Sequence, residues 1–293
     1  MPLMKKVILY YKFVPVADPA ITMRWQRELC NRLNLKGRII VSVHGINGTL
    51  GGDIEDLREY KREMNRSVMF KGIEYKWSAG TGKEFPRLSV KVRPELVAFG
   101  APNEIKVDDK GVVDGGKHLK PTALHKLIKE KEDVVFFDGR NAYEANVGRF
   151  KDAIVPDTET TRDFVSEIDS GKYDDIKDKP VVTYCTGGVR CEALSVLMKN
   201  RGFKEVYQMD GGIVKYGEKY ADDGYWEGSL YIFDGRMEQR FSEKSKDIGD
   251  CVHCKNKTSR YINCGEVSCN KLVLVCKDCG DISYCPKHVK ELV

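Results

Sequence analysis

Along the first hundred residues, alternating apolar and polar positions predict short strands, and two stretches with helical spacing separate them. Strands are predicted over KKVILYYKFV, over KGRIIVSVHGINGTLGG as two strands around the His44–Gly45 turn, and over IEYKWSAG and RLSVKVRPELV. Helices are predicted over DPAITMRWQRELCNRLN, with Asp18 as N-cap and Pro19 in first position, and over DIEDLREYKREMNR, capped by Asp53. The order β-α-β-β-α-β, with one extra strand, predicts a ferredoxin-like α+β domain over residues 1–98.

Strands alternate with helices in a second pattern from residue 116 to residue 228. Helices are predicted over PTALHKLIKEKE, NAYEANVG and EALSVLMKNRG, strands over DVVFFDGR, VVTY and FKEVYQM, and a turn over DGGIVKYG. This alternation predicts a parallel α/β sheet with helices on both faces and ligands beyond the carboxyl ends of its strands. Residues 99–115 are interpreted as a linker and residues 229–250 as a connector.

The stretch VVTYCTGGVRCEAL places Cys185 on a loop between a buried strand and a helix amino terminus. Backbone N–H groups converge there, and such surroundings lower the pKa of a cysteine to roughly 3.5–7.5. The active-site loop is expected to comprise Thr186, Gly187, Gly188 and Val189, whose glycines let backbone amides approach a sulfur atom closely. A buried structural cysteine is the alternative, and the paired glycines together with Arg190 argue against it.

Four further residues of this region are candidate catalytic residues. Arg190 is expected to favour the thiolate form of Cys185. Asp138 or Arg140 would hold the loop in shape, or the two would form a structural ion pair away from the chemistry. Cys191 would resolve a persulfide on Cys185 as a disulfide, or would only be a small residue that closes the loop.

Composition sets the class of protein. The chain has 293 residues, of which 41% are hydrophobic and 32% are charged, as expected for a globular protein of two or three domains. No apolar run approaches the ~20 residues of a membrane helix, and the amino terminus lacks the features of a signal peptide. A cytoplasmic location and no membrane partner are therefore expected.

Charge is distributed unevenly between the segments. Residues 1–100 carry 18 Lys and Arg against 10 Asp and Glu, whereas residues 101–240 carry 22 against 27. A basic first domain beside an acidic second one suggests a polyanion as partner of the first. The candidate RNA-binding residues are Arg87, Lys91 and Arg93, and a solvated basic face without a partner is the alternative.

Seven of the ten cysteines lie between Cys251 and Cys285, in a segment, residues 251–293, with few large apolar residues. Cys251, Cys254, Cys276 and Cys279 form two Cys-x2-Cys pairs separated by 21 residues, which is typical of a tetrahedral zinc site. Cys264, Cys269, Cys285 and His288 would form a second site, with His253 as a spare ligand, or would remain free thiols. One or two structural zinc ions are therefore expected.

Two sets of motifs resemble known families. FFDGR with Glu144, Gly148 and Ala153, and the stretch LMKNRGFKEVYQMDGGIVKY, resemble rhodanese domains, in which the matching cysteine, Cys185, would carry a persulfide. The Cys-x4-Arg loop is shorter than the Cys-x5-Arg loop of cysteine phosphatases, which argues against phosphatase chemistry. HGINGTL, PDT and CTGGVRCE, with the cysteine-rich tail, resemble the rhodanese-like tRNA uridine hydroxylases.

That resemblance implies oxygen-dependent 5-hydroxylation of the wobble uridine, with molecular oxygen as co-substrate, the tRNA anticodon loop as partner and no DNA partner. The residues themselves show no GxGxxG flavin motif and no His/His/carboxylate cluster for iron. Two alternatives remain open at this point. One is a sulfurtransferase that moves sulfane sulfur to an acceptor, and the other is a non-catalytic RNA-binding protein.

Overall fold

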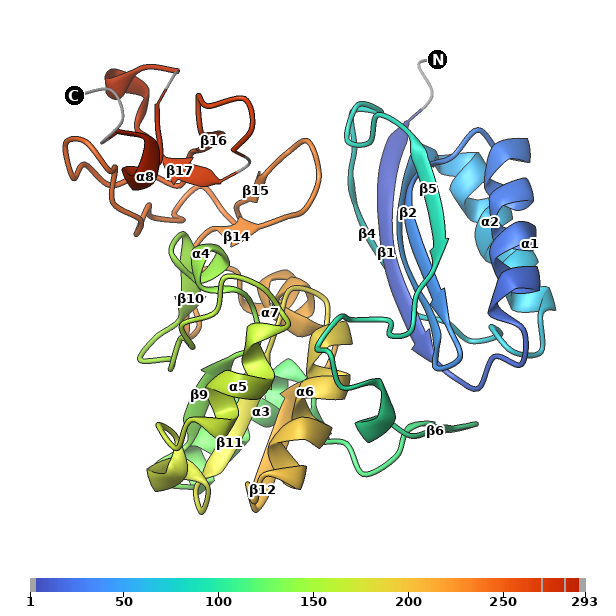
Figure 1. Cartoon of the computed structure of the whole chain (residues 1–293), viewed down its shortest axis with the longest axis horizontal. Coiled ribbons are helices and arrows are strands. Elements are labelled where there is room, and N and C mark those ends of the chain that lie inside the picture. Colours follow the sequence, from blue (N-terminus) through green and yellow to red (C-terminus); the bar gives the residue numbers. More distant parts are fainter. Residues whose placement is uncertain (1–3, 270, 282, 290–293) are drawn as a thin grey trace.

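The computed structural model of the chain describes residues 4–269, 271–281 and 283–289. A first domain with one sheet and two helices packs beside a parallel α/β domain, and a small cysteine-rich segment follows (Figure 1). In the described ranges, no helix is long and apolar enough to cross a membrane.

The first domain has the predicted ferredoxin-like topology. Its sheet has the strand order β4-β1-β3-β2-β5, in which the added strand β5 runs parallel to β2 and the other pairs are antiparallel. The elements are β1 (Lys5–Phe13), α1 (Pro19–Arg32), β2 (Lys36–Ser42), β3 (Gly45–Asp53), α2 (Ile54–Arg66), β4 (Tyr75–Ala79) and β5 (Leu88–Val92).

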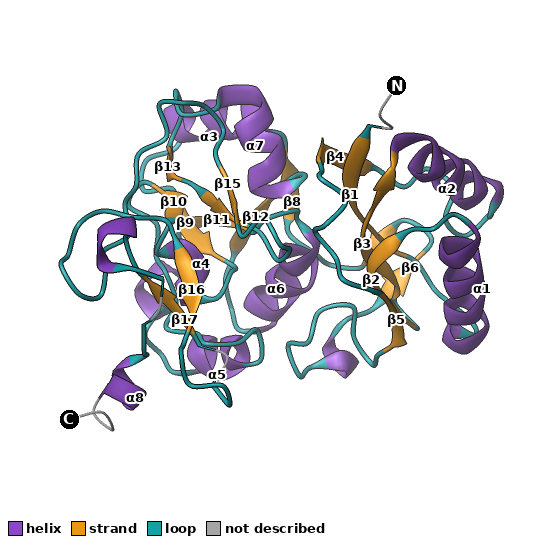
Figure 2. Ribbon diagram, turned by 90° about the horizontal axis from the view of Figure 1, so that it is seen from above, coloured by secondary structure: helices purple, strands orange, loops and turns teal. Residues whose placement is uncertain are grey.

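The two helices cover only one face of this sheet. Alternate residues such as Ile8, Tyr10 and Ile39 point toward α1 and α2 and form the domain core. The opposite, open face looks toward the second domain (Figures 1 and 2). The open face is therefore available to form a site between the domains.

The two predicted helix caps differ in the structure. Asp18 caps α1 as expected, because its carboxylate accepts hydrogen bonds from the backbone N–H groups of Ala20 and Ile21. Asp53 precedes α2, but its side chain makes no cap hydrogen bond. It instead forms an ion pair with Lys5 at 2.7 Å, so the prediction of a side-chain cap at Asp53 is wrong.

The second domain contains the predicted parallel sheet, with strand order β8-β12-β11-β9, in which β8 is an edge strand that the sequence patterns do not predict. Its elements are β8 (Lys117–Leu119), α3 (Pro121–Glu130), β9 (Val135–Asp138), α4 (Ala142–Ala145), α5 (Asp163–Asp169), η2 (Asp174–Ile176), β11 (Pro180–Tyr184), α6 (Val189–Asn200), β12 (Glu205–Met209) and α7 (Gly212–Tyr220). The predicted turn over DGGIVKYG is wrong, because this stretch forms α7. The helix begins at two glycines with positive φ, Gly211 at 70° and Gly212 at 66°.

Short elements link these layers. The linker contains η1 (Pro102–Glu104) and a hairpin of β6 (Val107–Asp108) and β7 (Gly111–Val112). Two more antiparallel pairs follow, β10 (Gly148–Phe150) with β13 (Trp226–Gly228) and β14 (Leu230–Tyr231) with β15 (Glu238–Gln239). The tail contains β16 (Tyr261–Asn263), β17 (Leu272–Leu274), η3 (Lys277–Cys279) and α8 (Pro286–Val289).

Helix α6 is buried on all sides from Arg190 to Met198, rather than on the single apolar face that the sequence predicts. One face packs on the parallel sheet through residues such as Leu194 and Leu197, in the same apolar cluster as Val181 and Val206. Phe13 and Leu96 of the first domain and the linker residues Phe99 and Ile105 also belong to this cluster. Because one core joins both domains, the open face of the first sheet has a fixed position over the amino terminus of α6.

Candidate active site and metal centres

The Cys185 loop lies between the amino ends of two helices. It follows β11 and leads into α6, and the backbone N–H of Gly188 donates a hydrogen bond to Sγ of Cys185 at 3.2 Å. The backbone carbonyl of Cys185 accepts from the N–H of Ile213 at 2.9 Å, and that of Thr186 accepts from Val214 at 3.1 Å. The start of α7 therefore fixes the loop from the other side.

Gly212 explains why α7 begins with glycine. A Cβ atom at this position would lie 2.4 Å from the carbonyl oxygen of Cys185 and 2.7 Å from the backbone nitrogen of Gly188. No side chain fits in this space, so the close contact between α7 and the loop requires glycine.

The surroundings of Cys185 stabilise its thiolate. Burial alone would raise the pKa of this fully buried thiol. A hydrogen bond from the Cys191 thiol, the charge of Arg190 and the N–H groups of residues 190 and 191 together lower the pKa to about 5. Burial and the adjacent Cys185 raise the pKa of Cys191, which stays protonated and is able to donate that bond. At neutral pH the pair is one thiolate and one thiol.

Arg190 is held by a carboxylate as well as by the loop. Its guanidinium forms two hydrogen bonds with the buried Glu144, at 2.5 and 2.9 Å, and a third with Oγ1 of Thr186 at 3.2 Å. The ring of Phe233 lies over it, 5.6 Å from ring centroid to Cζ. Arg190 therefore supplies positive charge next to Cys185, while its hydrogen-bond donors are largely occupied.

Asp138 and Arg140 pair with each other beneath the loop. Both side chains are fully buried and form a two-pronged ion pair with distances of 2.6 and 2.9 Å. The hydroxyl of Tyr184, the residue before Cys185, donates to Asp138 at 2.9 Å, and Arg140 donates to the carbonyl of Gly148 at 2.7 Å. This network holds the strand end that carries the loop, so a positioning role for both residues remains our prediction.

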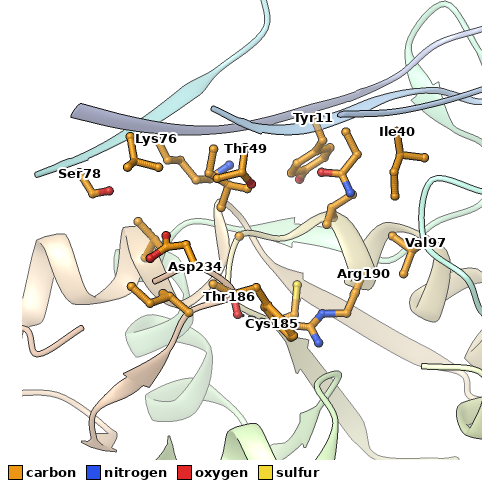
Figure 3. A pocket seen from close by; sticks show the side chains of 18 of the residues that line it. Tyr11, Ile40, Thr49, Lys76, Ser78, Val97, Cys185, Thr186, Arg190 and Asp234 are labelled. Atoms are coloured by element: carbon orange, nitrogen blue, oxygen red, sulfur yellow. Dashed lines mark hydrogen bonds between the residues drawn. The ribbon is translucent and has the colours of Figure 1, made fainter. Parts of the chain in front are cut away.

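A cavity of about 380 Å³ lies in front of the loop, and three parts of the chain form most of its walls, with further lining residues from 96–98 and from positions 141, 161 and 214. The loop itself forms the floor, from Cys185 to Arg190. The open face of the first sheet forms the roof, from which side chains including Tyr11, Thr49 and Lys76 point toward Cys185 (Figure 3). The segment 232–236, between β14 and β15, forms a side wall.

The sequence does not predict the roof or the side wall. Contacts across the seam join residues that lie far apart in the chain: the hydroxyl of Tyr11 donates to Glu192 at 3.1 Å, and Arg236 donates to Ser78 and to the carbonyl of Ala79 at 2.8 Å each. Residues at a sequence separation of more than 150 leave no local signal that would bring them together. The alternation of the first strands shows only which residues share a face.

The three candidate RNA-binding residues lie along the β5 edge of the first sheet. Arg87, Lys91 and Arg93 are exposed, and Lys91 pairs in register with Ile40 of β2. Because residues in register point to the same face and Ile40 lines the cavity, Lys91 lies on the open face beside the cavity; Arg87 and Arg93 directly flank β5, and none of the three lines the cavity.

The tail brings together both predicted sets of metal-binding residues. In each set, the sulfur or nitrogen donor atoms lie within 4.8 Å of one another. The two sets are Cys251, Cys254, Cys276 and Cys279, and Cys264, Cys269, Cys285 and His288. His253 belongs to neither set, and its Nε2 lies 2.7 Å from Oγ of Ser283.

The donor geometry fits zinc. With zinc–sulfur bonds of about 2.3 Å, tetrahedral ligands place sulfur atoms about 3.8 Å apart. The separation is 3.5 Å between Cys254 and Cys276 and 3.9 Å between Cys269 and Cys285. Nδ1 of His288 lies 3.4 Å from the sulfur of Cys264, as an imidazole ligand in the same tetrahedron would. Each set could hold one ion.

Comparison with family models divides the chain in the same order as the fold. Residues 5–96 match the UPF0176 acylphosphatase-like domain, residues 120–219 the rhodanese-like domain, and residues 227–288 the rhodanese C-terminal segment. The Cys185 loop falls within the rhodanese-like match, and the eight cysteine and histidine donors of the tail fall within the last one.

Relatives match this chain over nearly its whole length. A protein of Corynebacterium urealyticum, named tRNA uridine(34) hydroxylase, is 59% identical over 276 residues, which are 94% of this chain and 93% of that protein. A protein of the same name from Corynebacterium jeikeium is 60% identical and covers the same share of this chain and 89% of its own length. A third, from Corynebacterium diphtheriae, is 59% identical over 281 residues.

Proposed function

The chain belongs to the family of tRNA uridine(34) hydroxylases, and we propose that it hydroxylates uridine 34 of tRNA in the cavity in front of Cys185. It is an oxidoreductase of the rhodanese superfamily. One observation carries the proposal: a cysteine thiolate forms the floor of a cavity that a second domain closes. We also propose a cytoplasmic location, where tRNA is found.

The cavity suits a single base of an unpaired RNA segment. Its volume of about 380 Å³ is within the usual range for small-molecule sites. A base reaches such an enclosed site only after it has left the stack, and an anticodon loop offers unstacked bases at low cost. The anticodon position in the names of the relatives agrees with this requirement.

We further propose that carbon 5 of the uracil ring is hydroxylated and that molecular oxygen supplies the oxygen atom. Cys185 is the reactive group in this scheme, Arg190 keeps it ionised, and Cys191 donates a hydrogen bond to it. The tail would hold two zinc ions in a structural role, because each ion would have four protein ligands and no open position for a substrate.

Nucleoside analysis tests the proposal. Purified protein is incubated with oxygen, a two-electron reductant and tRNA from cells that lack the enzyme, and the nucleoside at position 34 is measured by mass spectrometry. Hydroxylation adds one oxygen atom to uridine 34. The tRNA of the cells that lack the enzyme gives a second measurement. If that tRNA has lost a thionucleoside, the sulfurtransferase alternative is supported. If its nucleosides are the same as in the parent cells, a non-catalytic RNA-binding protein is supported.

Charge reversal at Arg87, Lys91 and Arg93 should weaken tRNA binding. Basic side chains that contact phosphates release counterions from the RNA, which makes the affinity depend on salt. Replacement of all three residues by glutamate removes these contacts, so the affinity for tRNA should fall and its salt dependence should become less steep. Binding is measured by fluorescence anisotropy at several salt concentrations. The alkylation rate of Cys185 in the triple variant serves as a control, because it should equal that of the wild type. Reversal of the exposed Lys126 and Lys129 on α3 is the matched control. Unchanged affinity and salt slope in the triple variant would exclude this face as the RNA platform.

Phe233 should stack on a base of the RNA. Its ring lines the cavity, lies over Arg190 and is 44% exposed, which is unusual for a large aromatic side chain. Aromatic stacking contributes about 1–3 kcal/mol per base, so Phe233→Ala should raise KM for tRNA about tenfold or more. Phe233→Tyr retains the ring and should behave like the wild type. A normal KM in the alanine variant would contradict this role.

A further inference from the structure

Lys76 is a buried cation in the roof of the cavity. It lies on β4 opposite Leu9 of β1, its side chain is only 5% exposed, and it lines the cavity that contains Cys185 (Figure 3). Its Nζ lies 5.0 Å from the centroid of the Tyr11 ring. Among the residues that the structure describes, none forms a hydrogen bond or salt bridge with this ammonium group, and the charges of Glu74, Asp210 and Cys185 attract it without direct contact.

The other cations of the cavity are already paired. Arg190 is bound to Glu144, and Arg236 forms an ion pair with Asp234. Lys76 is therefore the lining cation that remains available to a ligand, in the region that the structure covers. An ammonium group that is only 5% exposed and makes no direct contact with an anion is unfavourable for folding alone, so a bound substrate is the expected direct partner.

We infer that Lys76 is a catalytic residue whose ammonium group binds the O4 oxygen of uracil, and that it stabilises the negative charge that forms there when the Cys185 thiolate adds to C6. This inference rests on the proposed function. It assigns the loop and the roof to opposite ends of one conjugated system, C6=C5–C4=O4 of the base, with the nucleophile at one end and the cation at the other.

The addition step is balanced without any other reactant. A lone pair of the Cys185 sulfur forms the S–C6 bond, the C5=C6 pair becomes the C4=C5 bond, and the C4=O4 pair moves onto O4. The negative charge passes from sulfur to O4, where Lys76 faces it, as donors do in an oxyanion hole. Carbon 5 becomes electron-rich, and it is the carbon that the proposed reaction hydroxylates.

The same step predicts an exchange reaction that needs no oxygen. In the absence of oxygen, the adduct takes a deuteron from D2O at C5, and elimination of the thiolate with loss of the original proton returns uridine with deuterium at C5. The gain of about 1 Da at uridine 34 is measured by mass spectrometry after anaerobic incubation with saturating tRNA. The wild type should exchange this hydrogen, and Cys185→Ser should not.

Lys76→Met should slow the exchange about 100-fold or more, the size of effect seen when one oxyanion donor is removed. Lys76→Arg keeps a cation and should retain part of the rate. Lys61→Met is the matched control, because Nζ of Lys61 also faces an aromatic ring, that of Tyr75 at 5.7 Å, on the helix-covered side of the same domain. Thermal melting checks the fold, and methionine at 76 should not lower the melting temperature because it replaces a buried charge. If Lys76→Met fails to fold, Lys76→Gln and Lys76→Arg decide the question.

The outcomes separate this inference from the function on which it rests. Exchange at the wild-type rate in folded Lys76→Met or Lys76→Gln protein would overturn the role of Lys76. Hydroxylation of uridine 34 by wild-type protein that never exchanges the hydrogen at C5 would overturn the addition step and leave the proposed function intact. A wild-type protein that neither hydroxylates nor exchanges would overturn the proposed function, and the inference with it.

Discussion

Cys185→Ser should abolish hydroxylation of uridine 34, with a loss of roughly 10³-fold or more, and leave the fold intact. A serine hydroxyl stays protonated where the thiol ionises, so the variant has no nucleophile at the floor of the cavity. Single-turnover assays with purified tRNA measure the loss, and circular dichroism with thermal melting shows whether the protein is folded. Cys30→Ala, a change in the core of the first domain, is the control and should keep its activity.

The pH dependence of alkylation gives a second test of the same residue. Because the pKa of Cys185 is about 5, the thiol is protonated below that pH and ionised above it, so the labelling rate should rise through pH 5 and be constant by pH 7. Burial raises the pKa of Cys30 to about 12, and it should remain unlabelled throughout. Labelling of Cys30 ahead of Cys185, or full activity in Cys185→Ser protein, would contradict the assignment.

Purified protein should contain two zinc ions per chain, and their removal should unfold the tail. Six of the ten described residues in the apolar cluster of this segment are cysteines, and only Val273, Val275, Ile262 and Tyr284 add other apolar side chains. Folding of such a segment depends on metal binding, which contributes roughly 10–16 kcal/mol in small zinc modules at neutral pH. Elemental analysis measures the zinc content. After chelation, limited proteolysis should cleave residues 251–289 while the two larger domains resist.

Single substitutions distinguish the two sites. Cys276→Ser should lose one zinc ion and Cys269→Ser the other, because each residue belongs to a different set of four ligands. Cys30→Ala should retain both ions. A metal-free protein whose tail resists proteolysis as well as the metal-bound form would contradict the prediction.

Local patterns were sufficient to predict much of the fold. The first sheet follows from strand alternation and from Asp18 and Pro19 at the start of α1, and the parallel sheet follows from the alternation of strands and helices. The sequence does not predict helix α7 because Asp-Gly-Gly is a turn signal; both glycines have positive φ, and Gly212 also lies too close to the Cys185 loop for a side chain. The complete burial of α6 also depends on residues outside its own segment, such as Phe99.

The sequence predicts the floor of the candidate site, but not its roof or its side wall. Cys185 and Arg190 lie on one continuous loop with a recognisable spacing, and the tail ligands repeat at short intervals, so their proximity could be inferred from the sequence. Lys76 sits in an ordinary alternating strand, and Phe233 lies in a segment interpreted as a connector. Their importance arises from tertiary contacts that close the cavity, and no local property distinguishes them in the sequence.

The seam between the domains has a consequence for substitutions in either one. A Cβ atom at Gly187 would lie 2.5 Å from Cδ2 of Leu9, so a larger residue at 187 requires the side chain at position 9 to move or to be smaller. These two positions belong to different domains, so a substitution in one domain changes the packing of the other. A rhodanese domain cut free of this chain would keep the thiolate loop and lose the roof that selects the base. The reactive thiolate and the roof that faces the base therefore reside in different domains, and a complete site requires both of them.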